Sequence, residues 1–529
     1  MIDFTVVDLS RLQFAATAMY HFLFVPLTLG LSFLMAIMES VYVMTGREIW
    51  RRMTLFWGTL FGINFAMGVA TGIVMEFQFG MNWSYYSHYV GDVFGAPLAM
   101  EGLMAFFLEA TFIGMFFFGW DRLSKLAHLC VTWLVALGAN FSALWILIAN
   151  GWMQNPVGAT FNPDTMRMEI VDFMAVLFNP VAQAKFVHTV SAGYVTGSMF
   201  VMAVSAIFLL GRRHQDLAKR SMAVAASFGL ASALSVVVLG DESGYVTTEH
   251  QKMKLAAMEG MWETEPAPAG LTLFGIPDQE ARQNHYAVHI PYALGVISTR
   301  SLSTEVPGIL DLVDRAEVRI RNGMASYDAL QRVRADKNDQ AARAEFEQSW
   351  PDLGYALLLK RYTDDVADAS DELVQKAAWD TVPDVGVLFW SFRLMVGLGI
   401  YFILFFGLAF VMSSRHQLGN SRPFLWLAVA SLPLPWVAIE AGWLVAEYGR
   451  QPWAIEGVLP TFYAASGLTI TDLVISLSFF LTLYTILAVI MVILMVKTIR
   501  KGPAAAYALI EGLGGSRHIP EAATATPDR

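Results

Sequence analysis

The sequence predicts an all-α, polytopic membrane protein with nine transmembrane helices. Three observations support this fold class: an apolar composition, nine long apolar segments, and basic residues confined to alternate connections. Hydrophobic residues make up 56% of the chain and charged residues only 15%, whereas soluble domains carry roughly 25% charged residues. The mean hydropathy is +0.49. The formal net charge is −10, and without a basic run the sequence does not favour a nucleic-acid partner.

Nine apolar segments are each long enough to cross a bilayer, which takes ~20 helical residues. The expected spans are 14–43, 55–79, 97–119, 127–149, 184–210, 221–240, 386–412, 423–447 and 468–497. Two of them contain Pro and Gly, in FVPLTLGL (24–31) and SLPLPW (431–436). These residues interrupt helices.

The basic residues predict the orientation, because Lys and Arg concentrate in cytoplasmic connections. Basic clusters follow the first, third, fifth, seventh and ninth spans: Arg47, Arg51 and Arg52; Arg122 and Lys125; Arg212, Arg213, Lys219 and Arg220; Arg415 and Arg422; Lys497, Arg500 and Lys501. The segments 80–96 and 150–183 hold only Arg167. We therefore expect a periplasmic N-terminus and a cytoplasmic C-terminus. Asp3 and Asp8 precede the first span where a signal peptide would have a basic region, so no cleaved signal is expected.

The chain divides into four predicted parts. Residues 1–240 hold the first six spans, and 386–500 hold the last three. Residues 241–385 are densely charged and are expected to form a large periplasmic loop with exposed helices. Residues 501–529 are predicted to be a disordered cytoplasmic tail.

The stretch Pro433–Trp453, PLPWVAIEAGWLVAEYGRQPW, combines an apolar span with carboxylates. Seven residues separate Glu440 from Glu447, which is close to two helical turns, and Trp443 lies between them on the same side. An ionised group in hydrocarbon is costly and usually faces a protein interior. Glu447 taken alone could also be a helix-end residue reaching the headgroups. With Arg450 at the exit, the pattern favours a buried polar site.

Other polar residues fall at a similar predicted depth, in the outer half of the membrane. They are His21, His188, Met395, Arg393, Glu101 and, two turns deeper, Glu109. His with Met suits a six-coordinate, electron-transferring haem iron, and a buried Arg requires an acidic partner such as a haem propionate. A membrane His can instead join two helices through a hydrogen bond, and a Met can simply fill a core. The single cysteine, Cys130, excludes an internal disulfide and a c-type haem attachment.

Long contiguous stretches of this sequence resemble subunit I of the cytochrome bd quinol oxidases. The resemblance covers essentially residues 1–500. Its most specific stretches are SRLQFAATAMYHFLFVPLTLG (10–30), GINFAMGVATGIVMEFQFGMNWSYYSHYVGDVFGAPLAMEGLMAFFLEATF (62–112), KFVHTVSAGYVTG (185–197), GDESGYVTTEHQKMKLAAMEGMWETEPAP (240–268) and GWLVAEYGRQPW (442–453).

The resemblance implies three haems and a ligand set for them. His188 and Met395 would ligate a low-spin haem b, with Arg393 steadying its charge. His21 and Glu447 would be axial ligands of two high-spin haems. We expect His21 to serve haem d and Glu447 the high-spin haem b, an arrangement reported to vary within the family.

The resemblance also implies roles for acidic and basic residues. Glu101 would lie beside the oxygen-binding haem, and Glu109 would belong to a proton path from the cytoplasm. The large loop matches the long form of the family's quinol-binding loop, in which Lys254 and Glu259 match positions linked to quinol oxidation. The residues alone favour a bland alternative for this stretch, an ordinary solvated charged face.

The expected function is therefore that of a terminal oxidase in a bacterial inner membrane. It would oxidise ubiquinol or menaquinol at the periplasmic side, reduce O2 to water with cytoplasmic protons, and build a membrane potential without pumping. The expected partners are the oxidase's second large subunit, possible small single-helix subunits and the lipid bilayer. A haem-copper oxidase needs about six membrane histidines and this chain offers two. A secondary transporter could use the buried carboxylates but would be colourless, and a membrane anchor leaves those carboxylates unexplained.

Overall fold

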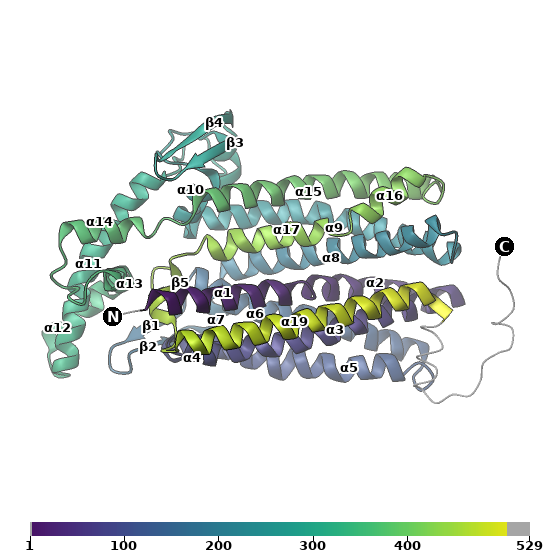
Figure 1. The fold of residues 1–529 in the computed structure, drawn as a ribbon, viewed down its shortest axis with the longest axis horizontal. Helices are drawn as coiled ribbons and strands as arrows, with labels where there is room; N and C mark the ends of the chain where they lie inside the picture. Colours follow the sequence, from purple (N-terminus) through teal and green to yellow (C-terminus); the bar gives the residue numbers. More distant parts are fainter. Residues whose placement is uncertain (1–2, 505–529) are drawn as a thin grey trace.

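The computed structural model describes residues 3–504 as a long helical bundle with a second body of short helices at one end (Figure 1). We call that end, which carries residues 251–384, the loop end. Within the described residues, nine helical segments are long and apolar enough to span a membrane, which confirms the predicted fold class. They are Phe4–Thr45, Glu48–Met81, Ser84–Phe118, Lys125–Gln154, Phe173–Leu210, Gln215–His250, Val385–Ser414, Arg422–Tyr448 and Ile470–Lys501. Residues 505–529 of the predicted tail lie outside the described part of the chain.

Several spans are interrupted, either by a break in the helix or by a π-helical turn. The first consists of α1 (Phe4–Phe22) and α2 (Val25–Thr45), with the break just before Pro26, which has no N–H to donate. The eighth consists of α16 (Arg422–Ala430), α17 (Leu434–Trp443) and the π-helical turn η5 (Leu444–Tyr448). The third contains α4 (Ser84–Met100), a π-helical turn η1 (Glu101–Phe106) and α5 (Phe107–Phe118). Such turns shift the face on which later side chains lie.

Among the remaining spans, the one that contains α8 is the most buried within the described bundle. The segments are α3 (Glu48–Met81), α6 (Lys125–Gln154), α7 (Phe173–Leu177), α8 (Pro180–Leu210), α9 (Gln215–His250), α15 (Val385–Ser414) and α19 (Ile470–Lys501). In α8 the run from Val195 to Ala206 is buried throughout, against α2, α6 and α9. Gly30 and Gly197 meet where α2 and α8 cross, and a Cβ on either would clash with the other helix's backbone. α9 extends to His250, beyond the predicted end of the sixth span at residue 240.

The loop-end body is mainly helical, with its own apolar core. It holds α10 (Lys252–Glu259), β3 (Leu271–Asp278), β4 (Gln283–Ile290), η2 (Gly295–Thr299), α11 (Ile309–Ala335), α12 (Gln340–Ser349), η3 (Trp350–Asp352), α13 (Leu353–Leu357), η4 (Leu358–Arg361) and α14 (Asp371–Trp379). The core includes Leu255, Val313 and Val374. The charged pattern predicted the exposed helices but not the antiparallel β3–β4 hairpin.

Two small hairpins complete the loop end. β1 (Ala159–Asn162) pairs with β2 (Arg167–Ile170), and β5 (Trp453–Ile455) pairs with β6 (Leu459–Pro460), both antiparallel. A short helix, α18 (Thr461–Ala464), follows β6. The β5–β6 hairpin is buried and closes the bundle just beyond η5.

Candidate functional site

A cavity of about 800 Å³ lies among the transmembrane helices towards the loop end. Its walls come from α1, α3, the η1 segment, α6 and the α17–η5 segment. Most of the lining is apolar, from residues such as Phe65, Leu98 and Leu147. The polar residues lining it include His21, Glu76, Glu101, Glu109, Asn150, Glu447 and Arg450. A large apolar cavity with a few convergent polar groups is the usual form of a cofactor site.

His21 lies in the last turn of α1, beside the break that separates α1 from α2. Its Nδ1 is 2.8 Å from the Thr71 hydroxyl oxygen on α3. That hydroxyl also lies 2.9 Å from the Met67 carbonyl and 3.1 Å from the Gly68 carbonyl, and a hydroxyl that donates to either carbonyl can accept from the imidazole. In that arrangement Nδ1 carries the ring proton, and Nε2 keeps a free lone pair. This is the tautomer that a metal-ligating histidine needs.

Three carboxylates from neighbouring helices line the same cavity. Glu101 opens the π-turn η1 and accepts a 2.7 Å hydrogen bond from Ser142 of α6. Glu109, 6% exposed, packs against Gly138, where a Cβ would lie 2.9 Å from the Glu109 Cγ. Glu76 of α3 also lines the cavity. The sequence analysis did not single out Glu76, although a lone carboxylate within GIVMEFQFG gives the same signal as Glu101.

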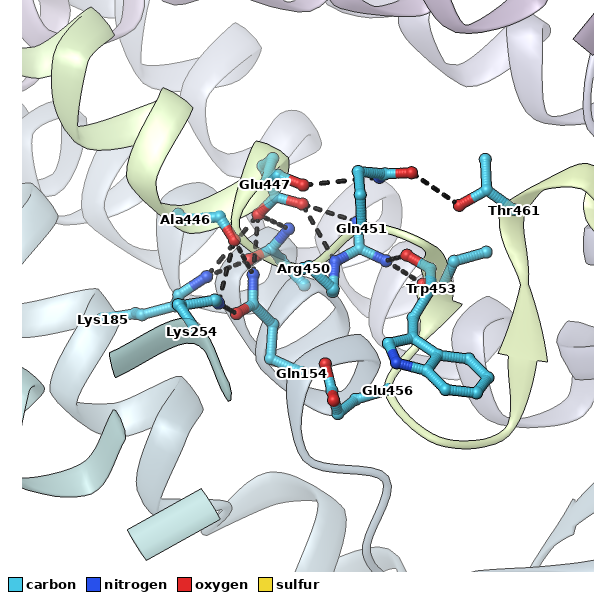
Figure 2. A network of polar contacts seen from close by, with 12 residues as sticks. Gln154, Lys185, Lys254, Ala446, Glu447, Arg450, Gln451, Trp453, Glu456 and Thr461 are labelled. Carbon is cyan, nitrogen blue, oxygen red and sulfur yellow. Dashed lines mark hydrogen bonds and ion pairs between the residues drawn. The ribbon is translucent and has the colours of Figure 1, made fainter. Parts of the chain in front are cut away.

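Glu447 lies at the loop-end wall of the cavity, inside a network of donors (Figure 2). Its Oε1 accepts from the Asn150 and Gln154 amides, at 2.9 Å each, and lies 3.6 Å from the Lys185 Nζ. Its Oε2 accepts from Arg450 at 2.6 Å. These donors compensate a carboxylate in an apolar protein interior. Its side chain nevertheless remains 30% accessible.

Glu440 does not share this wall, contrary to the prediction that it lies on one face with Glu447. Trp443 and Glu447 line the cavity and Glu440 does not. The π-helical turn from Leu444 to Tyr448 changes the angular spacing between the two carboxylates. Both carboxylate oxygens of Glu440 are buried without a hydrogen-bond partner among the described residues.

Lys254 connects the loop-end body to this network. It is 5% exposed, and its ammonium donates to the Gln251 side chain and the Ala446 carbonyl, both at 2.9 Å, and to the Gln154 side chain. The Gln154 amide in turn donates to Glu447, so one side chain joins Lys254 to Glu447. Burial, reinforced by nearby Lys185, lowers the pKa of Lys254 well below its usual range.

Glu259 and Arg393 form a second buried pair at the loop end. The Arg393 guanidinium lies 3.2 Å from the Glu259 carboxylate and also donates to the Met258 and Phe389 carbonyls. Burial raises the pKa of Glu259 to about 7, although Arg393 acts in the opposite direction. The predicted acidic partner of Arg393 is thus a loop residue in this structure. The solvated face considered for this stretch is wrong for Lys254 and Glu259, because both are buried.

His188 and Met395 lie outside the large cavity but close to it in height. Met395 abuts α17, with its sulfur 3.1 Å from where a Cβ on Gly442 would lie, and His188 similarly abuts Gly240. His188 is one turn along α8 from Lys185, which contacts Glu447. The His188 Nδ1 is buried without a hydrogen-bond partner among the described residues. Met395 thus lies beside α17, and His188 lies near the network around Glu447.

Comparison with known proteins identifies the family. A family model described as cytochrome bd terminal oxidase subunit I matches residues 9–503. This chain belongs to that family. It is 53% identical over 500 residues to a protein of Escherichia coli (strain K12) named cytochrome bd-II ubiquinol oxidase subunit 1, covering 94% of this chain and 97% of that one.

Two further cytochrome bd relatives come from Bacillus subtilis (strain 168). The cytochrome bd ubiquinol oxidase subunit 1 is 37% identical over 495 residues, covering 93% of each chain. A putative cytochrome bd menaquinol oxidase subunit I is 25% identical over 502 residues, covering 94% of this chain and 97% of that one. The solved bd oxidase of Geobacillus thermodenitrificans shares the fold, with a TM-score of 0.77, 24% identity, and coverage of 95% of this chain and 100% of that one.

Membership of the cytochrome bd family confirms the resemblance stated from the sequence and makes the chain a multi-pass protein of the bacterial inner membrane. It also removes the transporter and anchor alternatives. The sequence analysis missed Thr71 and Gln154, which hold His21 and Glu447 in place. An ordinary Thr or Gln carries no signal in a single sequence, because only its spatial neighbours reveal its role.

Proposed function

We propose that this cytochrome bd subunit carries the haems of a terminal oxidase that takes electrons from a quinol and reduces O2 to water. The observation that carries this proposal is the shared cavity with His21 on one wall and Glu447 on another. Its apolar lining, a His21 Nε2 with a free lone pair, and an accessible Glu447 side chain suit haem.

The proposed haem ligands are those that the family resemblance implies. His21 would hold haem d and Glu447 a high-spin haem b, while His188 and Met395 would hold a low-spin haem b. Arg450 and Arg393 supply positive charge near these positions. Bound haem iron would supply one-electron transfer and dioxygen binding.

Quinol oxidation would use the buried pairs at the loop end. Loss of two electrons from a quinol releases two protons, which require an acceptor within hydrogen-bond reach. Glu259, with its pKa raised to about 7, can accept such a proton near neutral pH. The Lys254 amine would exchange one of its three protein hydrogen bonds for a bond to a quinone oxygen.

Water formation consumes protons, and the cavity carboxylates provide a route for them. Glu109 lies further from the loop end than Glu101, and both line the cavity with Ser142. A proton taken up by Glu109 from the cytoplasmic side would pass to Glu101. If the loop end is periplasmic, proton release at the loop end and proton uptake through Glu109 would separate charge across the membrane without a pump.

The proposed partners are the second large subunit of the oxidase and small single-helix subunits. The substrate is a quinol, either ubiquinol or menaquinol. The relatives' names include both classes of quinol. Residues 251–384 are assigned to the quinol-binding loop.

The test is a reduced-minus-oxidised absorption spectrum of the purified oxidase carrying His21→Ala, His188→Ala or Glu447→Ala. Each variant is expected to lose or shift a different haem band. The matched control is His416→Ala, since His416 is exposed and far along the chain from the cavity. Unchanged spectra in all three site variants would overturn the ligand assignment, and a colourless wild-type protein would overturn the function.

A further inference from the structure

The β3–β4 hairpin presents an apolar surface that the proposed chemistry does not use. Its exposed side chains include Leu273 (54%) and Val288 (53%). Other exposed side chains are Phe274, Ile276, Tyr286, Ile290 and, just beyond β4, Tyr292, Val296 and Ile297. Contiguous exposed apolar side chains mark an interaction surface.

Contacts along α15 fix the height of this hairpin in the bundle. At its tip, Gln279 accepts a hydrogen bond from the Val385 N–H at the start of α15. Further along β3, Phe274 packs edge-on against Trp390 with ring centroids 5.4 Å apart. The Arg393 guanidinium reaches the Leu273 carbonyl, 3.2 Å away. Strand β3 therefore runs back along α15, and Leu273 lies ~12 Å deeper than the tip at 1.5 Å per helical residue.

The hairpin also lies on the outward-facing side of the bundle (Figure 1). Trp390 belongs to an exposed apolar stripe of α15 whose other members are Val387, Leu394, Ile400, Leu404 and Leu408. Arg300, which follows η2, pairs with two residues of α9: Asp241 at 3.3 Å and Glu242 at 2.6 Å. Asp241 continues the exposed stripe of Leu234 and Val238. The hairpin and η2 are thus attached to the outer ends of two exposed apolar stripes, on α9 and α15.

The polarity of the hairpin changes along its length. Its tip carries Asp278, Glu280, Arg282 and His285, at the level where α15 begins. Its other end, at the level of Trp390 and Arg393, is mostly apolar and includes one exposed histidine, His289. A membrane interface has the same gradient, from water through headgroups to hydrocarbon, and aromatic side chains are enriched there.

We propose that the β3–β4 hairpin and η2 form a membrane-interface anchor, with Leu273, Phe274, Val288 and Ile290 in contact with lipid and the charged tip in water. The anchor holds the strand to which Arg393 bonds, and through Arg393 it steadies the buried Glu259. We take lipid as the occupant, because the surface continues the exposed apolar stripes of two membrane-spanning helices, α9 and α15.

The experiment measures lipid contact directly. In a Cys130→Ser background of the complete oxidase, Leu273→Cys and Val288→Cys are labelled with a small fluorophore. The oxidase is then placed in nanodiscs of phosphatidylcholine and phosphatidylglycerol brominated near the top of the acyl chains. The controls are Glu280→Cys at the hairpin tip and Asn338→Cys between α11 and α12, both exposed.

The labels at 273 and 288 are expected to be quenched at least two-fold more than those at 280 and 338. Equal quenching at all four positions would overturn the proposal. A protein subunit covering the hairpin would give labels at 273 and 288 that brominated lipid does not quench, with the same emission in detergent, and would overturn it as well. Haem spectra of the same samples report separately on the proposed function.

Discussion

At the scale of single residues, the environment of His21 is decided by a hydroxyl group. The Thr71 hydroxyl is within hydrogen-bond distance of both the Met67 carbonyl and the His21 Nδ1, so it can donate to the carbonyl and accept from the imidazole. The sequence predicted His21 because an imidazole within an apolar span is rare. It gave no reason to select Thr71, which is one of many hydroxyl residues in the helices.

Thr71→Val tests this tautomer directly, because Val has the shape of Thr without an acceptor. Outer partners of a metal-ligating histidine are typically worth about 10–100-fold in metal affinity. We expect a lower haem-to-protein ratio and a shifted haem band, measured by absorption spectroscopy of the purified oxidase. Thr71→Ser keeps the hydroxyl and should restore both values. Identical spectra for the Thr71→Val and Thr71→Ser variants would refute the role of the hydroxyl.

At the scale of elements, the site depends on a helix break and on π-helical turns within the spans. The break before Pro26 ends α1 one residue after His21. The π-turn η5 brings Glu447 to the wall that Trp443 also lines. The C-terminal end of α6 brings Gln154 between Lys254 of the loop-end body and Glu447 of the bundle (Figure 2). Gly and Pro in the sequence predicted broken spans, but π-turns have no such signature.

A double-mutant cycle with Gln154→Leu and Lys254→Met measures the link between the two bodies. Removing the acceptor from a buried ammonium costs about 1–3 kcal/mol. Each single variant should therefore lower the thermal unfolding midpoint, and the double variant should be destabilised by less than the sum. Gln183→Leu, which removes a side-chain hydrogen bond to the Leu177 carbonyl at the loop end, is the control and should be additive with Lys254→Met. Additivity in the Gln154 cycle would rule out the coupling.

At the scale of the whole molecule, the two ends of the bundle differ in charge and in size. The basic clusters gather at the ends of spans away from the loop-end body, as at Arg212 and Arg213 after α8 and Arg415 after α15. From the positive-inside rule we expect the loop end to be periplasmic. In that orientation the proposed quinol oxidation and the proposed proton uptake would take place on opposite sides of the membrane.

The orientation can be measured by cysteine accessibility in intact cells. In the Cys130→Ser background, Asn338→Cys lies in the loop-end body and Gln417→Cys follows α15 at the opposite end, and both positions are exposed. After the outer membrane is made permeable, a membrane-impermeant maleimide should label position 338. Position 417 should react only after the cells are lysed. The reverse pattern would place the loop end in the cytoplasm.

The sequence alone determined the nine spans and the positions of most polar side chains within them. This was possible because hydrocarbon excludes charged groups, so the apolar spans and the polar residues within them can both be recognised from the sequence. The tertiary structure decided which exceptions meet: Glu76 joins the cavity and Glu440 does not, Arg393 reaches Glu259, and Gln154 bridges Lys254 to Glu447. Hydrogen bonds act over about 3 Å, so a pairing between residues more than 90 positions apart depends on how the helices cross and where they break. No local sequence pattern shows where helices cross.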